Sequence, residues 1–324
     1  MKVTVLGCGR WASFHAWYQS TKLKNKTMVW GRNMDSAYEE LKRTRQNNYV
    51  TFDKSVQFTS DLDEALRFSN HIIIAISAQG MEDLSERIGQ LNPKNKTFIL
   101  CMKGIINTTG ERLSEVMRKQ VDKSNKICVW VGPGHPQEFV KGLFNIMLLA
   151  GESREFTCEL AKLFKSSLIR FYQTDDLIGA EIGAAAKNVL GITAGMLDGS
   201  GCEHLKGPLM AHGIREVARL IVKMGGKELT AYGTSCLGDF QATLFSENSH
   251  NRRFGEYIVQ KKDTSAIGTA EGFATSEALH RLAERYKVEM PICEICYKIL
   301  HEGKDPKDGL KELFLRENAD EFKC

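Results

Sequence analysis

The sequence predicts an α/β fold, in which a doubly wound sheet of parallel strands is followed by an all-helical C-terminal domain. Short apolar runs rich in Val, Ile and Phe alternate with longer helical patterns as far as about residue 175. Beyond that point the spacing of apolar residues is almost wholly helical. A chain of 324 residues is long enough for two domains. We therefore expect one domain over residues 1–175 and a second over residues 176–324.

The expected strands of the first domain are short, β-branched runs that mostly end at Gly or Ser. They cover residues 3–6, 28–30, 71–77, 97–102 and 127–131, with 145–150 and 168–172 closing the sheet. Helical patterns over 61–68 and 81–91 lie between them, and Ser60 or Asp61 can cap the first of these. In the second domain we expect helices over 178–197, 207–222, 276–286 and 292–301.

Charge and composition exclude several classes of protein. The net charge is +4, from 44 basic and 40 acidic residues, and no long basic block occurs, so we expect no nucleic-acid partner. No apolar run reaches the ~18 residues that a membrane span needs. Nine cysteines, an odd number, and a chain without a signal peptide indicate thiols in a reducing cytoplasm. His204, His212 and His250 are too scattered for us to expect a metal site.

The first expected strand runs into a glycine loop with the letters GCGRWA at residues 7–12, which fits the pattern G-x-G-x-x-A. Gly7 permits a tight turn, Gly9 lets the backbone approach a pyrophosphate, and Ala12 keeps the following helix close to the sheet. The motif stands after a strand and opens a helix, which is the context that gives it meaning. It predicts a Rossmann-type domain that binds NAD or NADP, with Arg10 and Trp11 also contacting the cofactor.

The end of the second strand bears on which cofactor is used. NAD-specific sites usually place Asp or Glu there, whereas this chain has Gly31, Arg32 and Asn33. Arg32 can stack on adenine or meet a 2′-phosphate, which favours NADP or dual use. It can equally be a solvated loop arginine. The choice between NAD and NADP therefore stays open.

Two lysines are candidates for the chemistry. Lys103 follows the strand over 97–102, and Gly132 and Gly134 follow the next strand, so all three should lie at strand carboxyl ends, where ligands of such sheets bind. Lys187 stands in the Ala- and Gly-rich helix over 178–197. A lysine in so apolar a segment needs a partner or has its pKa lowered, which makes it a candidate general acid/base. The alternative is a lysine at the exposed edge of that helix.

The sequence resembles the NAD(P)-dependent glycerol-3-phosphate dehydrogenases, especially the bacterial form, over nearly its whole length. The resemblance rests on motifs that occur in the same order: residues 7–12 and 29–32, Lys103-Gly104, Gly132-Pro133, GAAAKNV at 183–189, Gly238-Asp239, NRRFG at 251–255, Glu271-Gly272, Met290-Pro291 and EGKD at 302–305.

The resemblance implies a role for several residues. Lys187 would be the proton acceptor in alcohol oxidation, and Lys103 would bind and polarise the substrate oxygens. Asp239 would position the lysine or a hydroxyl group, Asn251 would sit on the phosphate loop, and Glu271 would contact the cofactor. The expected cofactor contacts are Gly7, Gly9, Arg10, Trp11, Ala12, Arg32, Lys103, Pro136 and Glu271. The expected substrate contacts are Lys103, Gly132, Gly134, Lys187, Asp239, His250, Asn251 and Arg252.

This chain departs from the family pattern at the end of the site that should hold the anion. The family usually has Arg where this chain has His250, next to the Asn of the phosphate loop. An arginine offers phosphate a fixed two-pronged fork, whereas a histidine offers at most one or two donors and is often neutral. Either Arg252 or Arg253 then reaches the phosphate, or the site accepts a different anion. The other departures are Gly134 for Ser, Pro136 for Ala, His204 for Asn, and Ala211-His212 for Thr-Arg.

The leading hypothesis is an oxidoreductase that interconverts sn-glycerol 3-phosphate and dihydroxyacetone phosphate with NAD or NADP. The resemblance further implies a cytoplasmic homodimer that feeds phospholipid synthesis. One alternative is a dehydrogenase for another small phosphorylated or phosphonate-bearing hydroxy compound, and a ketopantoate-reductase-like or hydroxyacid dehydrogenase fits the same two-domain plan. An alternative from a different class is a non-catalytic dinucleotide sensor, which would keep Gly7 and Gly9 but would not need Lys187.

Overall fold

The computed structural model describes residues 1–268 and 270–316. The chain divides into two compact units. The first contains Met1–Gly104 and Glu111–Glu181, and the second contains Ile105–Gly110 and Ile182–Cys324. The chain therefore passes from one unit to the other after residues 104, 110 and 181.

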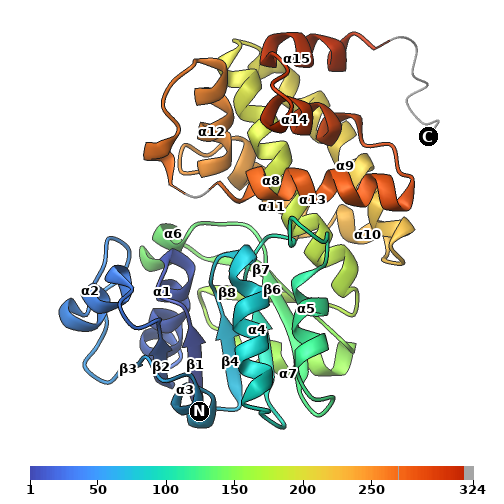
Figure 1. Ribbon diagram of the computed structural model, residues 1–324. Coiled ribbons are helices and arrows are strands. Elements are labelled where there is room, and N and C mark those ends of the chain that lie inside the picture. Colours follow the sequence, from blue (N-terminus) through green and yellow to red (C-terminus); the bar gives the residue numbers. More distant parts are fainter. Residues whose placement is uncertain (269, 317–324) are drawn as a thin grey trace. The chain divides into compact units, whose positions relative to one another are not determined.

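The first unit contains an eight-stranded sheet in the order β3-β2-β1-β4-β5-β6-β7-β8 (Figure 1). The strands from β3 to β6 are all parallel, so the expected α/β class with a Rossmann-type sheet is confirmed. The strands are β1 (Lys2–Leu6), β2 (Lys26–Trp30), β3 (Gln57–Thr59), β4 (His71–Ile74), β5 (Thr97–Leu100), β6 (Lys126–Val131), β7 (Asn145–Gly151) and β8 (Ile169–Thr174).

One edge of the sheet departs from the parallel run that the alternation of strands and helices predicted. Strand β7 pairs with β6 in antiparallel register, and β8 then runs parallel to β7. A parallel neighbour needs a crossover connection over a face of the sheet. The segment after β6 instead holds only the five-residue helix α6 (Pro136–Val140), whose Phe139 packs 4.7 Å from the Phe14 ring. The chain therefore turns back beside β6.

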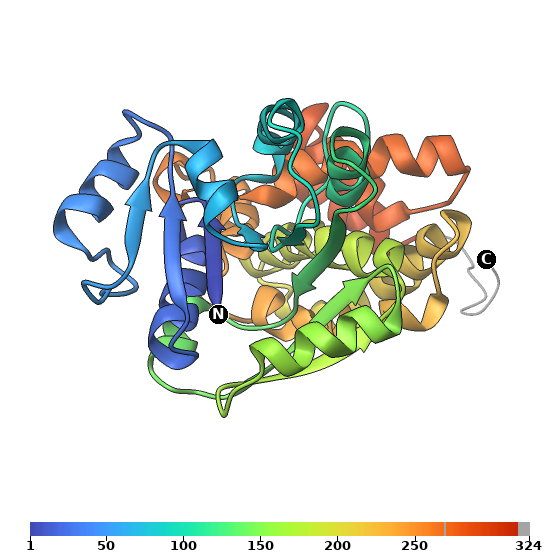
Figure 2. The same cartoon turned by 90° about the horizontal axis from the view of Figure 1, so that it is seen from below.

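Helices cover both faces of this sheet. Figure 2 shows α7 on one side of the strands and α4 and α5 on the other. Asp61 caps α3, where its side chain accepts hydrogen bonds from the backbone N–H groups of Asp63 and Glu64, which confirms one of the two predicted caps. The helices are α1 (Arg10–Trp17), α2 (Ser36–Thr44), α3 (Leu62–Phe68), α4 (Met81–Gln90), α5 (Leu113–Gln120), α6 and α7 (Arg154–Phe164).

The second unit is helical throughout the elements that the structure describes, as the sequence predicted. Its first helix, α8 (Leu177–Gly199), begins in the first unit and continues past the last crossing point at residue 181. The others are α9 (Lys206–Lys223), α10 (Glu228–Ala231), α11 (Leu237–Leu244), α12 (His250–Val259), α13 (Glu271–Tyr286), α14 (Pro291–His301) and α15 (Pro306–Phe314).

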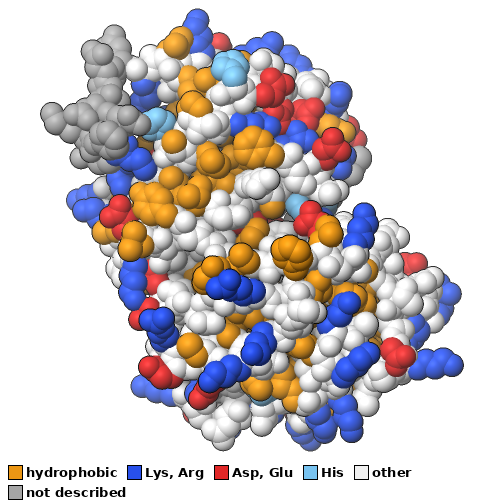
Figure 3. Space-filling model, turned by 180° about the vertical axis from the view of Figure 1, so that it is seen from behind, with side chains coloured by type: hydrophobic (Ala, Val, Ile, Leu, Met, Phe, Trp, Pro, Cys, Tyr) orange, Lys and Arg blue, Asp and Glu red, His pale blue; other side chains and the backbone are white. Residues whose placement is uncertain are grey.

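On the face shown in Figure 3, Lys and Arg side chains are scattered over the first unit, with fewer Asp and Glu side chains between them. Within residues 1–268 and 270–316, every helix is too short or too polar to cross a bilayer.

The core between α1 and the sheet contains an unusual polar residue, His15. The His15 side chain is fully buried, and neither ring nitrogen has a hydrogen-bond partner. Its ring lies 4.8 Å from Trp130 and 5.2 Å from Phe14. Burial lowers the pKa of His15 from 6.5 to about 3, because a charged imidazolium loses its hydration there. The folded protein therefore holds this imidazole neutral.

This burial predicts a loss of stability in mild acid. The unfolded chain protonates His15 below pH 6.5, whereas the folded chain resists protonation down to about pH 3, so stability falls as pH drops through that window. At ~1.4 kcal/mol per pH unit, protonation of His15 in the unfolded chain should lower the free energy of unfolding by about 2 kcal/mol between pH 6 and pH 4. Urea unfolding at a series of pH values measures it, with His15→Phe as the reference. If the free energy of unfolding fell by the same amount with pH in wild type and in His15→Phe, the loss of stability would not come from His15.

Candidate active site

The glycine loop after β1 uses its two glycines for different reasons. Gly7 has φ +127°, and a Cβ there would lie 2.4 Å from the Ala75 carbonyl oxygen, so the fold itself requires glycine. Gly9 has φ −72°, which any residue adopts, and a Cβ there would meet nothing within 4 Å. Neither the backbone conformation nor the packing of the protein therefore requires glycine at position 9. The close approach of a ligand to this backbone would require it.

The N-terminus of α1 is left open for an anion. Gly9 is its N-cap residue, no side chain accepts hydrogen bonds from the first-turn N–H groups, and no acidic residue lies in the first turn. Those N–H groups and the positive end of the helix dipole suit a pyrophosphate. Burial, helped by Asp35, raises the pKa of Cys8 to about 11, so the thiol in the loop remains neutral at pH 7. These features fit a dinucleotide.

Three of the predicted site residues of the first unit lie together. The Lys103 ammonium group donates a hydrogen bond to the Gly132 carbonyl oxygen at 2.6 Å, and it lies 5.3 Å from the centre of the Trp11 ring. Lys103 follows β5, Gly132 follows β6, and Trp11 is the second residue of α1, the helix after β1. Carboxyl ends of parallel strands meet at one edge of the sheet, so these elements bring the three residues to the same place.

Gly134, one of the departures from the family pattern, is required by the local structure. Its φ is +108°, and a Cβ there would lie 2.3 Å from the Asn145 side-chain nitrogen. A serine at this position would therefore need a different local backbone. Pro136 is buried and is the first residue of α6.

Arg32 is the cation that bears on cofactor choice. Its side chain is 71% exposed and lies 3.7 Å from Asp35, whose carboxylate caps α2. The guanidinium is thus accessible to an adenosine ribose or its 2′-phosphate, which leaves NAD and NADP both open.

A buried ion pair lies in the second unit. The Lys187 ammonium nitrogen is 3.0 Å from Asp239 Oδ2, and it donates a hydrogen bond to Thr243 Oγ1 at 2.5 Å. Lys187 is 5% exposed and Asp239 is 1% exposed. The alternative of a lysine at the exposed edge of its helix is therefore wrong. A buried lysine with a carboxylate and a hydroxyl as partners is held in one position, as proton transfer requires.

Helix α11 explains why these partners converge. Asp239 and Thr243 are four residues apart on it, so they share one helix face. A Cβ at Gly191 would lie 2.6 Å from Thr243 Cγ2, which shows how closely α8 and α11 approach. Sequence reasoning missed Thr243, although its spacing from Asp239 was a usable signal.

The remaining predicted residues of the second unit lie on α12 and α13. The Asn251 side chain donates to Asn188 Oδ1 at 3.1 Å and accepts from the Gly272 backbone N–H at 2.9 Å, so it joins α12 to α8 and α13. His250 is the first residue of α12, and Glu271 is the first residue of α13.

The Arg252 guanidinium is engaged within the protein. Its Nη1 contacts Asp198 at 2.6 Å and Glu256 at 3.4 Å, and its Nε donates to the Ser246 carbonyl oxygen. The Lys206 ammonium group contacts the same Asp198 at 2.5 Å. Because Arg252 and Lys206 both pair with Asp198, less of their positive charge is available to an external anion.

Comparison with known proteins identifies the family. The model of the NAD-dependent glycerol-3-phosphate dehydrogenase N-terminus matches residues 2–157, and the model of the C-terminus of the same family matches residues 176–311. The chain belongs to this family. The sequence-based resemblance is therefore confirmed.

Individual relatives cover almost the whole of this glycerol-3-phosphate dehydrogenase family member. A glycerol-3-phosphate dehydrogenase [NAD(P)+] of Thermoanaerobacter sp. is 33% identical over 99% of both chains. One from Carboxydothermus hydrogenoformans is 32% identical over 99% of this chain and 98% of its own. The crystal structure of the Coxiella burnetii glycerol-3-phosphate dehydrogenase has a TM-score of 0.91 at 26% identity, covering 97% of this chain and 99% of that one.

The contrast between the two loop glycines gives a test of the cofactor site. Gly9→Ala should leave the unfolding temperature within about 2 °C of wild type, since its Cβ meets no protein atom. It should weaken NADH binding at least tenfold, because the methyl group occupies the path of the pyrophosphate. Fluorescence titration with NADH measures this. Gly7→Ala is the control and should lower the unfolding temperature. Unchanged NADH affinity in Gly9→Ala would refute the assignment.

Proposed function

We propose that this chain interconverts sn-glycerol 3-phosphate and dihydroxyacetone phosphate by hydride transfer with NAD or NADP. The observation that carries the proposal is the buried pair of Lys187 and Asp239 in a member of the glycerol-3-phosphate dehydrogenase family. It supplies a fixed proton donor and acceptor. The open N-terminus of α1 in the first unit supplies the place for the cofactor pyrophosphate.

The nicotinamide cofactor accepts or supplies the hydride, and the chain does the rest. Lys187 exchanges a proton with the oxygen on C2 of the substrate. Asp239 holds the ammonium group of that lysine in place, and Thr243 fixes the direction of its N–H bonds. The positive charge of Lys103 stabilises the negative charge that develops on the substrate oxygens.

The proposal is tested by oxidation of NADH or NADPH when dihydroxyacetone phosphate is added. Lys187→Met should lower kcat by about 100-fold or more, because the proton donor is removed. Its NADH affinity should be unchanged, because the glycine loop is intact. Lys298→Met, on the half-exposed surface of α14, is the control and should keep wild-type turnover. A non-catalytic sensor would show no turnover in any of these proteins.

A second candidate function is the dehydrogenation of another small phosphorylated or phosphonate-bearing hydroxy compound. The observation that favours it is the engagement of Arg252 by Asp198 and Glu256, next to a position where His250 replaces the usual arginine of the family. The anion end then has less fixed positive charge than a family member with that arginine. A panel of phosphorylated and phosphonate hydroxy compounds separates the two candidates by kcat/KM.

Replacing His250 with arginine tests whether the loss of this positive charge changes the affinity for the substrate phosphate. If the chain retains glycerol phosphate specificity with a weakened anion contact, His250→Arg should lower KM for dihydroxyacetone phosphate by about tenfold, the scale of one charge-assisted hydrogen bond. Steady-state kinetics measure it. His280→Arg adds the same charge on α13 beside Glu294 and should leave KM unchanged. An unchanged or higher KM in His250→Arg would favour the second candidate.

We further propose a cytoplasmic homodimer. Sedimentation of the purified protein should give twice the 36.4 kDa mass of one chain. A mass of one chain would contradict the dimer.

A further inference from the structure

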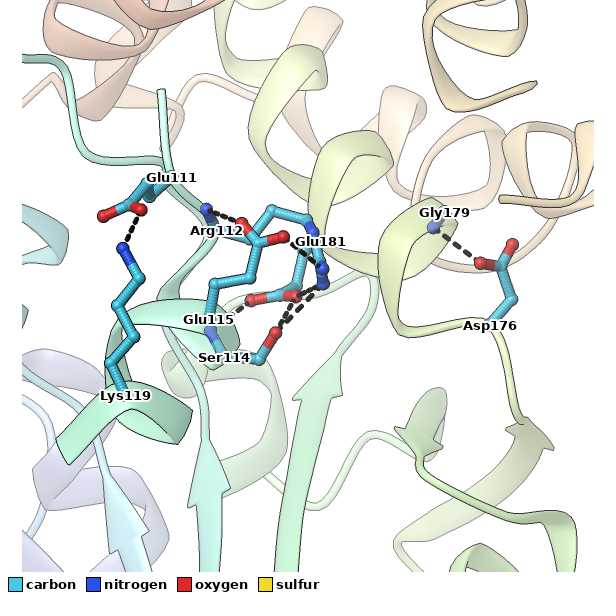
Figure 4. A network of polar contacts seen from close by, with 8 residues as sticks. All are labelled: Glu111, Arg112, Ser114, Glu115, Lys119, Asp176, Gly179 and Glu181. Carbon is cyan, nitrogen blue, oxygen red and sulfur yellow. Dashed lines mark hydrogen bonds and ion pairs between the residues drawn. The ribbon is translucent and has the colours of Figure 1, made fainter. Parts of the chain in front are cut away.

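A buried carboxylate stands at the last residue of the first unit, in the second turn of α8. Glu181 accepts a hydrogen bond from Arg112 Nη1 at 2.7 Å and from Ser114 Oγ at 2.5 Å on one oxygen. Its other oxygen accepts from the Ser114 backbone N–H at 2.9 Å. Figure 4 shows the three donors converging on this carboxylate from the start of α5.

The cation of this network, Arg112, makes further bonds through both of its terminal nitrogens. Arg112 Nη1 also donates to Ser114 Oγ at 3.0 Å, and its Nη2 pairs with Glu115 at 2.7 Å. Glu115 in turn accepts from the Arg112 backbone N–H at 3.0 Å, which closes the first turn of α5. Arg112 and Glu181 are both buried, whereas Glu115 is 44% exposed.

The network joins two of the places where the chain passes between the units. Arg112 lies one residue after Glu111, where the chain returns to the first unit, and Glu181 is the last residue before the chain leaves again. The first turn of α8 is closed by Asp176, which accepts a hydrogen bond from the Gly179 N–H at 2.9 Å (Figure 4). The bonds from Arg112 and Ser114 to Glu181 then fix the start of α8 to the start of α5.

One continuous helix, α8, links the fixed residue Glu181 to Lys187. The helix is continuous from Leu177 to Gly199, so Lys187 lies six residues beyond Glu181, which is about 9 Å along the axis. An α-helix of this length transmits rotation about its axis and direction from one end to the other. A shift or rotation of the helix at Glu181 is therefore passed along the same helix to Lys187.

A buried ion pair adds little stability over an apolar contact of the same shape, because both charges lose their hydration. The ion pair instead restricts the orientation of the helix. Apolar packing allows a helix to slide or rotate by small amounts, whereas three donors on one carboxylate allow a single orientation. We propose that Glu181, held by Arg112 and Ser114, is a positioning residue for Lys187, and that it sets the rate of proton and hydride transfer without touching substrate or cofactor. This inference rests on the proposed function, in which Lys187 is the proton donor.

The test uses Glu181→Gln, in which the amide nitrogen faces the donors of Arg112 and Ser114. A second variant, Arg112→Met with Glu181→Met, removes both charges and keeps apolar packing, so it folds even where the single change is too destabilising. Glu115→Gln is the matched control. It neutralises a carboxylate that pairs with the same arginine but leaves every bond from Arg112 and Ser114 to Glu181 intact. All assays are made below the lowest unfolding temperature of the set.

We expect kcat with dihydroxyacetone phosphate and NADH to fall at least tenfold in both Glu181 variants and to stay within twofold of wild type in Glu115→Gln. The dissociation constant for NADH should stay within twofold in all of them, because the glycine loop is unchanged. Amide hydrogen exchange in residues 182–187 of the full-length protein should be faster in both Glu181 variants and unchanged in Glu115→Gln.

Two results would overturn the inference. The first is a kcat within twofold of wild type in either Glu181 variant. The second is a rise in the NADH dissociation constant that matches the fall in kcat, since the network would then support the first unit in general. Failure of the proposed function has a different signature, because wild-type protein itself would then lack turnover with dihydroxyacetone phosphate. The exchange measurement remains decisive in that case, and unchanged exchange in both Glu181 variants would overturn the inference.

Discussion

The close packing of helices against α8 is the constraint on which the second unit depends. A Cβ at Gly195 would lie 1.8 Å from the Arg252 carbonyl oxygen, and one at Gly255 would lie 1.9 Å from the Ile192 carbonyl oxygen. Backbones that approach so closely tolerate only glycine at these points. The motif glycine of NRRFG therefore serves packing, and it places Asn251 where its side chain joins α8 to α13.

This packing also explains how a lysine finds a partner inside an apolar helix. Asp239 lies 3.0 Å from the Lys187 ammonium nitrogen, on α11, which the glycines of α8 allow to approach. The ion pair holds the lysine side chain in position. At the proposed anion end the balance differs, because Asp198 engages both Arg252 and Lys206 and leaves less positive charge for a ligand. In the function that we propose, the pair of Lys187 and Asp239 is thus preorganised for proton transfer, and the anion end is where the departure from the family pattern at His250 lies.

The sequence predicted the parts of the fold that local patterns encode. The glycine loop, the strands of the parallel run and the long helix around Lys187 were all visible as spacing of residue types. Strand β3 was not, because three residues carry no periodicity, and the reversal at β7 was not, because an apolar run has no direction. Contacts between distant residues were also invisible. The pairing of Arg252 with Asp198 spans 54 residues, and that of Arg112 with Glu181 spans 69.

Direct hydride transfer between cofactor and substrate can be followed with an isotope label. NADH carrying deuterium at both C4 positions would be incubated with the protein and dihydroxyacetone phosphate, and the product would be analysed by mass spectrometry and NMR. We expect glycerol 3-phosphate with a single deuterium, located on C2, because the hydride passes directly between C4 of the nicotinamide and C2 of the substrate. Oxidation of NADH without deuterated glycerol 3-phosphate, or deuterium at any other carbon, would contradict it.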